Sequence, residues 1–119
     1  MVCVMTTNTQ QSSEAPAFHT VAPGVELCFL RRHTDRGTTF LVRMAAGAHA
    51  QLHDHPGGEE TYLISGKLRI GERDLVPGDY YYAPPGEIHD GYAAEAALFF
   101  VVAPGGLVPV GEPRPVQTP

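Results

Sequence analysis

Cysteine, positive charge and long apolar runs are all scarce in this sequence, and each shortage excludes a class of protein. The two cysteines, Cys3 and Cys28, are too few for a disulfide framework or a zinc-finger set, so we expect unpaired thiols in a reducing compartment. We expect Cys28 to be a small buried hydrophobe of a strand. Eight Lys and Arg residues stand against thirteen Asp and Glu residues. The net charge of −5, without a basic run, argues against nucleic acid or an anionic membrane as a partner.

Apolar stretches are too short for a membrane span. The apolar start at residues 1–5 stops at Thr6 and lacks a basic flank, so it does not resemble a signal peptide. No run approaches the roughly 18 apolar residues that a spanning helix needs. We therefore expect a cytoplasmic protein with no membrane partner. The 119 residues have room for one domain, and the hydrophobic fraction of 43% is enough for one core.

Helical periodicity is missing as well, while residues that interrupt helices are abundant. The 13 glycines and 11 prolines make about a fifth of the chain, against roughly 12% in an average protein. Apolar and β-branched runs alternate with turn signals, and Ser65-Gly66 is one of the expected turns. The expected strands are residues 25–30, 38–44, 62–64, 68–70, 75–76, 80–83 and 98–102. This pattern predicts an all-β, antiparallel sandwich or barrel.

Composition divides the chain into three segments. Residues 1–20 form a leader that we expect to be disordered or extended, because residues 6–15 are mostly polar and have little to bury. Residues 21–103 form the expected barrel. Residues 104–119 are rich in Pro and Gly, which prevents regular pairing as a central strand, so we expect a tail or a strap across the surface.

Histidine and glutamate are concentrated in one part of the expected barrel. His53 and His55 leave the same face of a strand, because side chains alternate along it. The turn at residues 56–58 can bring Glu59 alongside, and His89 can add a ligand from a distant strand. Three neutral imidazoles and one carboxylate can hold a divalent ion without filling its coordination sphere. Such mixed ligands favour iron, manganese, nickel, cobalt or zinc over calcium or magnesium.

Each of these residues alone has a plainer explanation, but glycine spacing favours a site. A lone His-x-His pair is a weak signal, and a lone glutamate after a turn is normally solvated. Here Gly47 is followed after five residues by His53-x-His55, after three more by Glu59 and after six more by Gly66. Glycine is expected at only about 7% of positions, so this arrangement is not a coincidence.

A second segment repeats this kind of spacing. Gly78 is followed after five residues by Pro84-x-Gly86, and His89 comes after two more. Together the two segments resemble the two motifs of the cupin superfamily, which are small antiparallel β-barrels of jelly-roll type. The family's second motif usually ends with Asn where this chain has Ala93, and that position is not a ligand in the pattern.

The resemblance to cupins implies a specific metal site. It implies that one divalent transition metal per chain is bound by His53, His55, Glu59 and His89, with Glu60 next to the site but outside it. The gap between the two motifs in this chain, residues 67–77, is short and resembles that of compact bacterial single-domain members of the family. Dimers are usual in the family.

Residues 55–60 and 84–89 are similar to small cupins related to dihydroxyacetophenone dioxygenase and to the cupin domain of ChrR-type anti-sigma factors. The first group implies an oxygenase acting on a small chelating substrate, such as a diketone, hydroxyketone or hydroxylated aromatic. Glu59 would then be the catalytic residue that tunes the charge at the metal. The second group implies a sensor that binds a metal or ligand. An isomerase, epimerase or decarboxylase on the same site is a further alternative.

Three residues are candidates for a substrate pocket. Gln51 and His49 share strand parity with His53, and Thr61 shares parity with Glu59. A bulge near Gly47 would instead leave His49 on the rim.

Other side chains of the expected barrel have plainer roles. We expect the tyrosines at positions 80–82 to be packing aromatics. Arg43 is either a contact for an anionic substrate or a solvated strand residue. Tyr62, Ile64, Phe99 and Val101 alternate along their strands and could form an outward apolar face, which predicts a homodimer.

Overall fold

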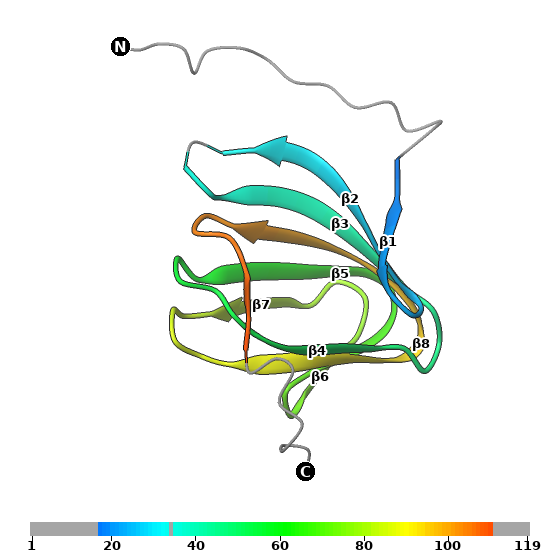
Figure 1. Cartoon of the computed structure of the whole chain (residues 1–119). Helices are drawn as coiled ribbons and strands as arrows, with labels where there is room; N and C mark the ends of the chain where they lie inside the picture. The colour runs from blue at the N-terminus through cyan, green and yellow to red at the C-terminus, as the bar shows by residue number, and fades with distance from the viewer. Residues whose placement is uncertain (1–16, 34, 111–119) are drawn as a thin grey trace.

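The computed structural model describes residues 17–33 and 35–110, and within these ranges the chain forms nine β-strands and no helix (Figure 1). The described ranges accordingly hold no helix long and apolar enough to cross a membrane. The strands are β1 (His19–Ala22), β2 (Val25–Arg32), β3 (Thr38–Met44), β4 (His49–Asp54), β5 (Glu59–Ile70), β6 (Arg73–Leu75), β7 (Tyr80–Ala83), β8 (His89–Ala103) and β9 (Val108–Pro109).

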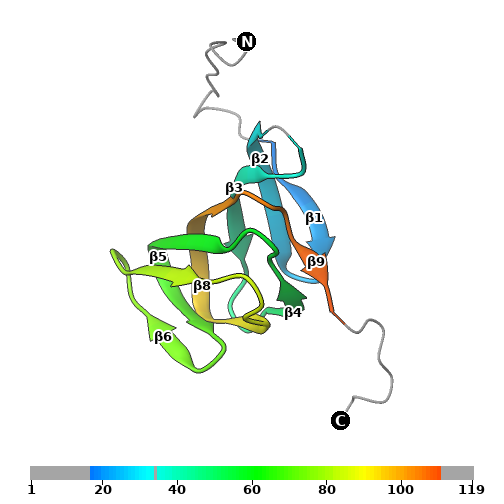
Figure 2. The same cartoon turned by 90° about the vertical axis from the view of Figure 1, so that its left-hand side faces the viewer.

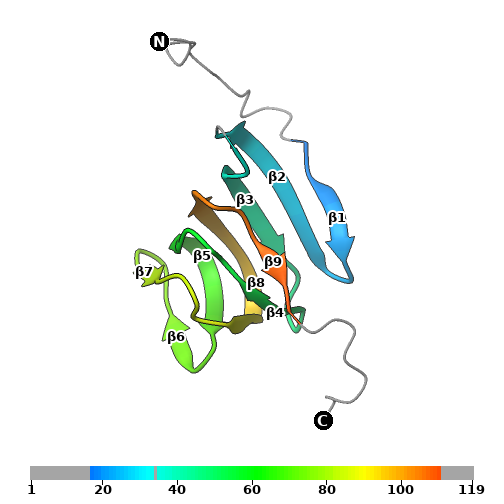
Figure 3. The same ribbon diagram turned by 60° about the vertical axis from the view of Figure 1, so that its left-hand side comes forward.

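The strands form one curled antiparallel sheet, which confirms the predicted all-β class. Its main path runs β1-β2-β3-β8-β4-β9, while β5 pairs with β6, β7 and β8. The long strand β8 makes the curl possible, because its first part pairs with β4, its last part pairs with β3, and β5 runs along it from the other side. Figure 3 shows β1 and β6 at opposite edges of the curled sheet.

Alternation along β3, β5 and β8 directs every second residue into the barrel. The direct cross-strand partners Leu63 and Phe99 both belong to the core. The expected outward face is therefore half wrong: Phe99 and Val101 are buried, at 8% and 1% exposed, whereas Tyr62 and Ile64 are exposed. Residues that pair across neighbouring strands point to the same side of the sheet. The sequence did not reveal that Val101 pairs with the inward residue Thr61.

Ser65-Gly66 is not the turn that the sequence predicted but an irregularity inside the continuous strand β5. The pairing of β5 with β8 shifts register on both sides of Ser65, as expected for β-bulges. Gly66 has a φ of +88°, and a Cβ at this position would overlap the carbonyl oxygen of Ala96. The glycine signal was real, but it marks a bend in a long strand rather than a chain reversal.

Both ends of the described chain pair with the sheet. β1 begins at His19, inside the range assigned to the leader, and it pairs with β2. After β8, the chain returns across the end of the barrel and β9 pairs with β4, with Pro109 opposite His53 (Figure 2). Cys28 is a free, buried thiol, as expected, whereas Cys3 lies outside the described residues. Most of the leader and residues 111–119 also lie outside them.

We expect Gly66→Ala to lower the free energy of unfolding by about 3 kcal/mol or more, because it combines backbone strain with overlap on Ala96. Gly78→Ala is the matched control. Gly78 has a similar φ of +96°, but a Cβ there would meet no atom within 4 Å, so we expect a loss of about 1 kcal/mol. Urea unfolding of both variants measures the difference, and equal losses would contradict the tight approach of β5 and β8 at the bulge.

Candidate metal centre

Three strands and one turn bring the four predicted ligands together. His53 lies on β4 and is the direct cross-strand partner of His89, the first residue of β8. His55 follows β4 and opens a tight turn in which the Gly58 N–H donates to its carbonyl oxygen at 2.8 Å. Glu59 comes directly after this turn as the first residue of β5. The structure therefore gathers all four side chains that the motif spacing singled out.

The ligand atoms surround one carboxylate oxygen. Glu59 Oε1 lies 3.1 Å from His89 Nε2, 3.6 Å from His53 Nε2 and 3.7 Å from His55 Nε2. One ligand atom from each of the four residues lies within 4.8 Å of the others. Ligands bound at about 2.1 Å stand roughly 3–4 Å apart around a single ion, so this spacing suits a metal.

Unpartnered nitrogens give the strongest indication that a cation belongs here. His53 Nε2 and both ring nitrogens of His55 are buried and have no hydrogen-bond partner in the described structure. Buried polar atoms are normally paired, and each exception costs about 1–3 kcal/mol. A divalent ion would use the imidazole lone pairs that the protein leaves unused, so the residues present fit a transition metal.

The protonation states also suit a metal. Burial raises the pKa of Glu59, but contacts with the imidazoles of His53 and His89 outweigh burial and lower it to about 2. Glu59 is therefore a carboxylate at any physiological pH. Burial is the largest influence on His55 and lowers its pKa below 6.5, so its ring is neutral at neutral pH and can act as a ligand.

The cluster opens onto a cavity of about 370 Å³ in the barrel interior. Two of the three predicted pocket residues, Gln51 and Thr61, line it, as do His53, Glu59 and His89. His49 does not: it is exposed, and its Nε2 contacts Asp90 Oδ2 at 2.7 Å. His49 thus lies on the rim, but the register shift that accompanies this lies between Ala50 and His53 and not near Gly47, where a bulge was considered.

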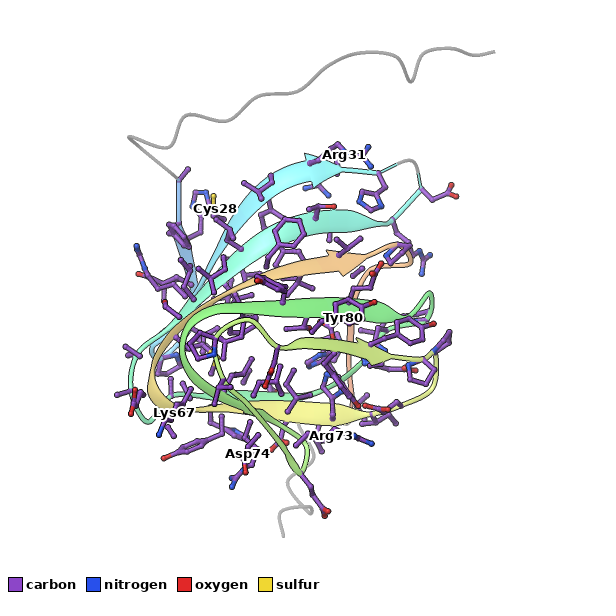
Figure 4. All side chains as sticks on the ribbon, turned by 180° about the vertical axis from the view of Figure 1, so that it is seen from behind. Cys28, Arg31, Lys67, Arg73, Asp74 and Tyr80 are labelled. Carbon is purple, nitrogen blue, oxygen red and sulfur yellow. The ribbon has the colours of Figure 1, made fainter. Side chains whose placement is uncertain are left out.

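Two other candidates lie outside the cavity lining. Glu60 faces outward, where its carboxylate accepts a hydrogen bond of 2.8 Å from the Tyr80 hydroxyl; Tyr80 is labelled in Figure 4. Arg43 is exposed, pairs with Glu26 at 2.7 Å and covers the ring of Phe18. Arg43 thus has the position of a solvated strand residue and does not line the cavity.

Known proteins with similar sequences place this chain in a family. The family model described as the ChrR cupin-like domain matches residues 6–107. The chain belongs to this cupin family. The DNA damage-repair/toleration protein DRT102 of Arabidopsis thaliana is 32% identical over 91 residues, which are 71% of this chain and 28% of that protein. Ribosomal protein uL16 3-hydroxylase of Escherichia coli (strain K12) is 30% identical over 76 residues, 59% of this chain and 20% of that protein. The cupin chain thus spans less than a third of either relative.

Solved structures confirm the jelly-roll cupin fold. A provisionally assigned acetylacetone dioxygenase of Methylibium petroleiphilum PM1 matches with a TM-score of 0.82 at 18% identity, covering 100% of this chain and 90% of that chain. Acetylacetone dioxygenase of Acinetobacter johnsonii matches with 0.70 at 17%, covering 85% and 80%. ChrR of Rhodobacter sphaeroides, in complex with SigE, matches with 0.69 at 20%, covering 78% and 52%. Identities this low show the fold alone.

The cupin also contains a hydrogen-bonded support for His89 that sequence reasoning missed. His89 Nδ1 donates to Glu87 Oε2 at 3.2 Å, and the Tyr81 hydroxyl donates to the same oxygen. Tyr81 thus does more than pack, whereas Tyr80 and Tyr82 are exposed. The Glu-x-His spacing of residues 87 and 89 was the available signal. Burial lowers the pKa of His89, but hydrogen bonds with Glu59 and Glu87 outweigh it and raise the pKa above 6.5.

In the metal-free cupin, we expect His89 to titrate above 6.5, and Glu87→Gln to lower its pKa. The amide can still accept the Nδ1 hydrogen, but it lacks the charge that stabilises the imidazolium. A ¹H–¹⁵N NMR titration of the ring nitrogens measures both values. Glu60→Gln is the control, because it removes the carboxylate of the similar Tyr80–Glu60 pair outside the site and should leave His89 unchanged. An unchanged titration in Glu87→Gln would show that Glu87 does not support the ring.

Proposed function

We propose that this cupin is a metal-dependent, oxygenase-like enzyme that acts on a small oxygenated substrate, such as a diketone, hydroxyketone or hydroxylated aromatic. The observation that carries the proposal is the opening of the histidine–glutamate cluster onto a cavity of about 370 Å³. This volume lies in the range of small-molecule sites. A purely structural metal site has no need of such a space beside it.

The metal is proposed to be one divalent ion per chain, bound by His53, His55, Glu59 and His89. The unpartnered imidazole nitrogens support this assignment. Four protein ligands leave positions open on an ion that prefers five or six. When bound, the ion supplies Lewis acidity and, if it is iron, reactivity toward dioxygen.

The side chains around the ion have separable tasks. Glu59 is the cluster's only carboxylate, so it sets the charge there and is the proposed catalytic residue. His55, at 0% exposed, is placed by the turn that follows β4. Thr61 is buried two positions after Glu59 and can orient a substrate oxygen with its hydroxyl, and Gln51 can do so with its amide.

We expect the purified cupin to bind one equivalent of divalent metal, and His53→Ala/His55→Ala to lose it. Removing two imidazoles should weaken metal affinity by well over tenfold, because even indirect contacts to ligands matter by tenfold or more. His49→Ala is the matched control, since it removes an exposed histidine of the same strand that points elsewhere. Elemental analysis and competition with a chelating dye measure both quantities. Stoichiometric metal in the double variant would place the site elsewhere.

The function is tested by oxygen uptake. The iron-loaded cupin, prepared without air, should consume oxygen with a small diketone or hydroxyketone and show a shifted metal spectrum on binding it. Glu59→Gln should keep the fold, checked by circular dichroism, and lose most turnover because the ion loses its balancing charge. Spectral shifts and uptake that are unaffected by Glu59→Gln would contradict its catalytic role.

A sensor is the second candidate, favoured by the match to the ChrR cupin-like family and by the neighbour solved in complex with SigE. A sensor would report metal or ligand occupancy to a protein partner. The sensor would be favoured if the protein holds zinc tightly, shows no spectral shift with diketones or hydroxyketones, and takes up no oxygen after iron loading. Conversion of a substrate without oxygen uptake would favour an isomerase, epimerase or decarboxylase.

A homodimer is proposed through an outer face that differs from the one first expected. Leu41, Phe100, Tyr62 and Tyr80 are successive cross-strand partners on β3, β8, β5 and β7, so they form one apolar row on the outside. Covering such a row with a second copy stabilises the dimer by about 25 cal/mol per Å² of apolar surface.

The proposed location is the cytoplasm, and the free thiol of Cys28 supports this because thiols stay reduced there.

Light scattering should give twice the chain mass of 12.8 kDa at micromolar concentration. Tyr62→Glu, which places a charge in the middle of the row, should give the chain mass. Thr20→Glu adds the same charge on β1, away from the row, and should leave the dimer intact. A wild-type mass of one chain would reject the dimer.

A further inference from the structure

A carboxylate outside the cluster joins the two turns that carry ligands. Asp54 is the last residue of β4, between His53 and His55, and strand alternation directs its side chain away from the His53 imidazole. Asp54 Oδ1 accepts the backbone N–H of His55 at 2.7 Å and the backbone N–H of Gly86 at 3.2 Å. Asp54 therefore links the turn after β4 to the turn before β8, although Gly86 lies 32 residues further along the chain.

Strand pairing gives these two turns little support of its own. The pairing of β4 with β8 shifts register between Ala50 and His53, and it ends at the pair of His53 and His89 because His89 is the first residue of β8. Past this pair both segments pass into turns. The hydrogen bond from Gly86 to Asp54 thus continues the connection beyond the end of the paired strands.

Close packing restricts the turn after β4 on two further sides. A Cβ on Gly57 would lie 2.6 Å from the backbone nitrogen of Gly105, and a Cβ on Gly58 would lie 2.9 Å from the hydroxyl oxygen of Tyr82. These approaches leave the turn little room to shift. Packing therefore limits where the turn lies, and the two hydrogen bonds of Asp54 set its distance from the turn before β8.

The connection to Gly86 also bears on His89. Glu87 follows Gly86 directly, and its Oε2 accepts the hydrogen bond from His89 Nδ1 at 3.2 Å. Holding the backbone at Gly86 thus helps to hold both a ligand of the cluster and the carboxylate that supports this ligand. Asp54 itself does not line the cavity, and its two hydrogen bonds go to backbone N–H groups.

We propose that Asp54 is a positioning residue, which sets the separation of His55 and His89 before a metal binds. Its carboxylate holds the two ligand-bearing turns at the spacing that one ion needs, so the ion does not have to draw them together. Such preorganisation raises affinity, because less ordering remains to be done on binding. The inference rests on the metal site of the proposed function and goes beyond it by giving a task to a residue outside the cluster.

Metal affinity of Asp54 variants tests the inference. The probes are Co²⁺ and Zn²⁺, each titrated into the metal-free full chain in competition with a chelating dye. We expect Asp54→Ala to weaken both ions by about tenfold or more and to change the absorption spectrum of bound Co²⁺, because residues that orient ligands contribute on this scale. Asp54→Asn keeps an oxygen that can accept both N–H groups, so it should recover most of the affinity and the wild-type spectrum.

Two further variants separate position from charge and from general stability. Asp54→Glu keeps the charge but moves the carboxylate by one methylene, so it should bind Co²⁺ more weakly than Asp54→Asn does. Asp79→Ala is the matched control, because Asp79 Oδ2 accepts the Val76 N–H at 2.9 Å in the turn between β6 and β7, which carries no ligand of the cluster. It should keep the wild-type affinity and spectrum. Thermal unfolding shows which variants are folded, and if Asp54→Ala is not, the order of Asp54→Asn and Asp54→Glu decides.

The outcomes separate this inference from the proposed function. Wild-type affinity in Asp54→Ala, equal losses in Asp54→Ala and Asp54→Asn, or tighter binding by Asp54→Glu than by Asp54→Asn would overturn the positioning role. Each would leave the oxygenase proposal in place, because oxygen uptake by the wild-type chain tests that proposal. Loss in Asp54→Ala with recovery in Asp54→Asn, but no oxygen uptake by the iron-loaded wild-type chain, would support the positioning role and reject the oxygenase. A wild-type chain that binds neither ion would overturn both.

Discussion

A buried carboxylate surrounded by imidazoles is the constraint on which the rest of this structure depends. Glu59 lies 3.1 Å from His89, and three imidazole nitrogens nearby have no hydrogen-bond partner in the described structure. Such an arrangement is unfavourable for a protein alone, because buried polar atoms lose their interactions with water. Strand pairing holds it in place: β4 and β8 set His53 opposite His89, and β9 pairs beside His53. The barrel thus carries a local cost that a bound cation would offset.

The interior divides into a polar end and an apolar remainder, and this division shapes the chemistry. No Lys, Cys, Ser or Tyr lines the cavity in the part of the chain that the structure describes. The polar lining residues are Gln51, Thr61 and Asp90, together with His53, Glu59 and His89 of the cluster. Glu87 accepts hydrogen bonds from His89 Nδ1 and from the Tyr81 hydroxyl. These bonds orient the His89 ring, whose other nitrogen faces Glu59.

Cross-strand pairing explains both the successes and the errors of strand parity. Within one strand, alternation correctly placed Thr61 inward with Glu59 and Tyr62 outward. Between strands it failed, because Phe99 and Val101 were grouped with Tyr62 although their true partners are Leu63 and Thr61. Bulges add a second source of error. Gly66 bends β5 without ending it, and the irregularity in β4 leaves His49 on the rim while Ala50 turns toward the cavity.

The sequence alone determined the all-β class, the cupin family and the four residues of the cluster, because glycines, prolines and histidines at fixed spacings encode local turns and strand faces. Only the tertiary structure decided what depends on contacts between distant segments. Which strands lie side by side decides the pairing of Glu87 with His89 and the lining of the cavity. It also decides the position of Arg43 outside that lining and the outward row through Phe100. Side-chain alternation is a property of one strand, whereas register is a property of two, and one sequence read along its length records only the first.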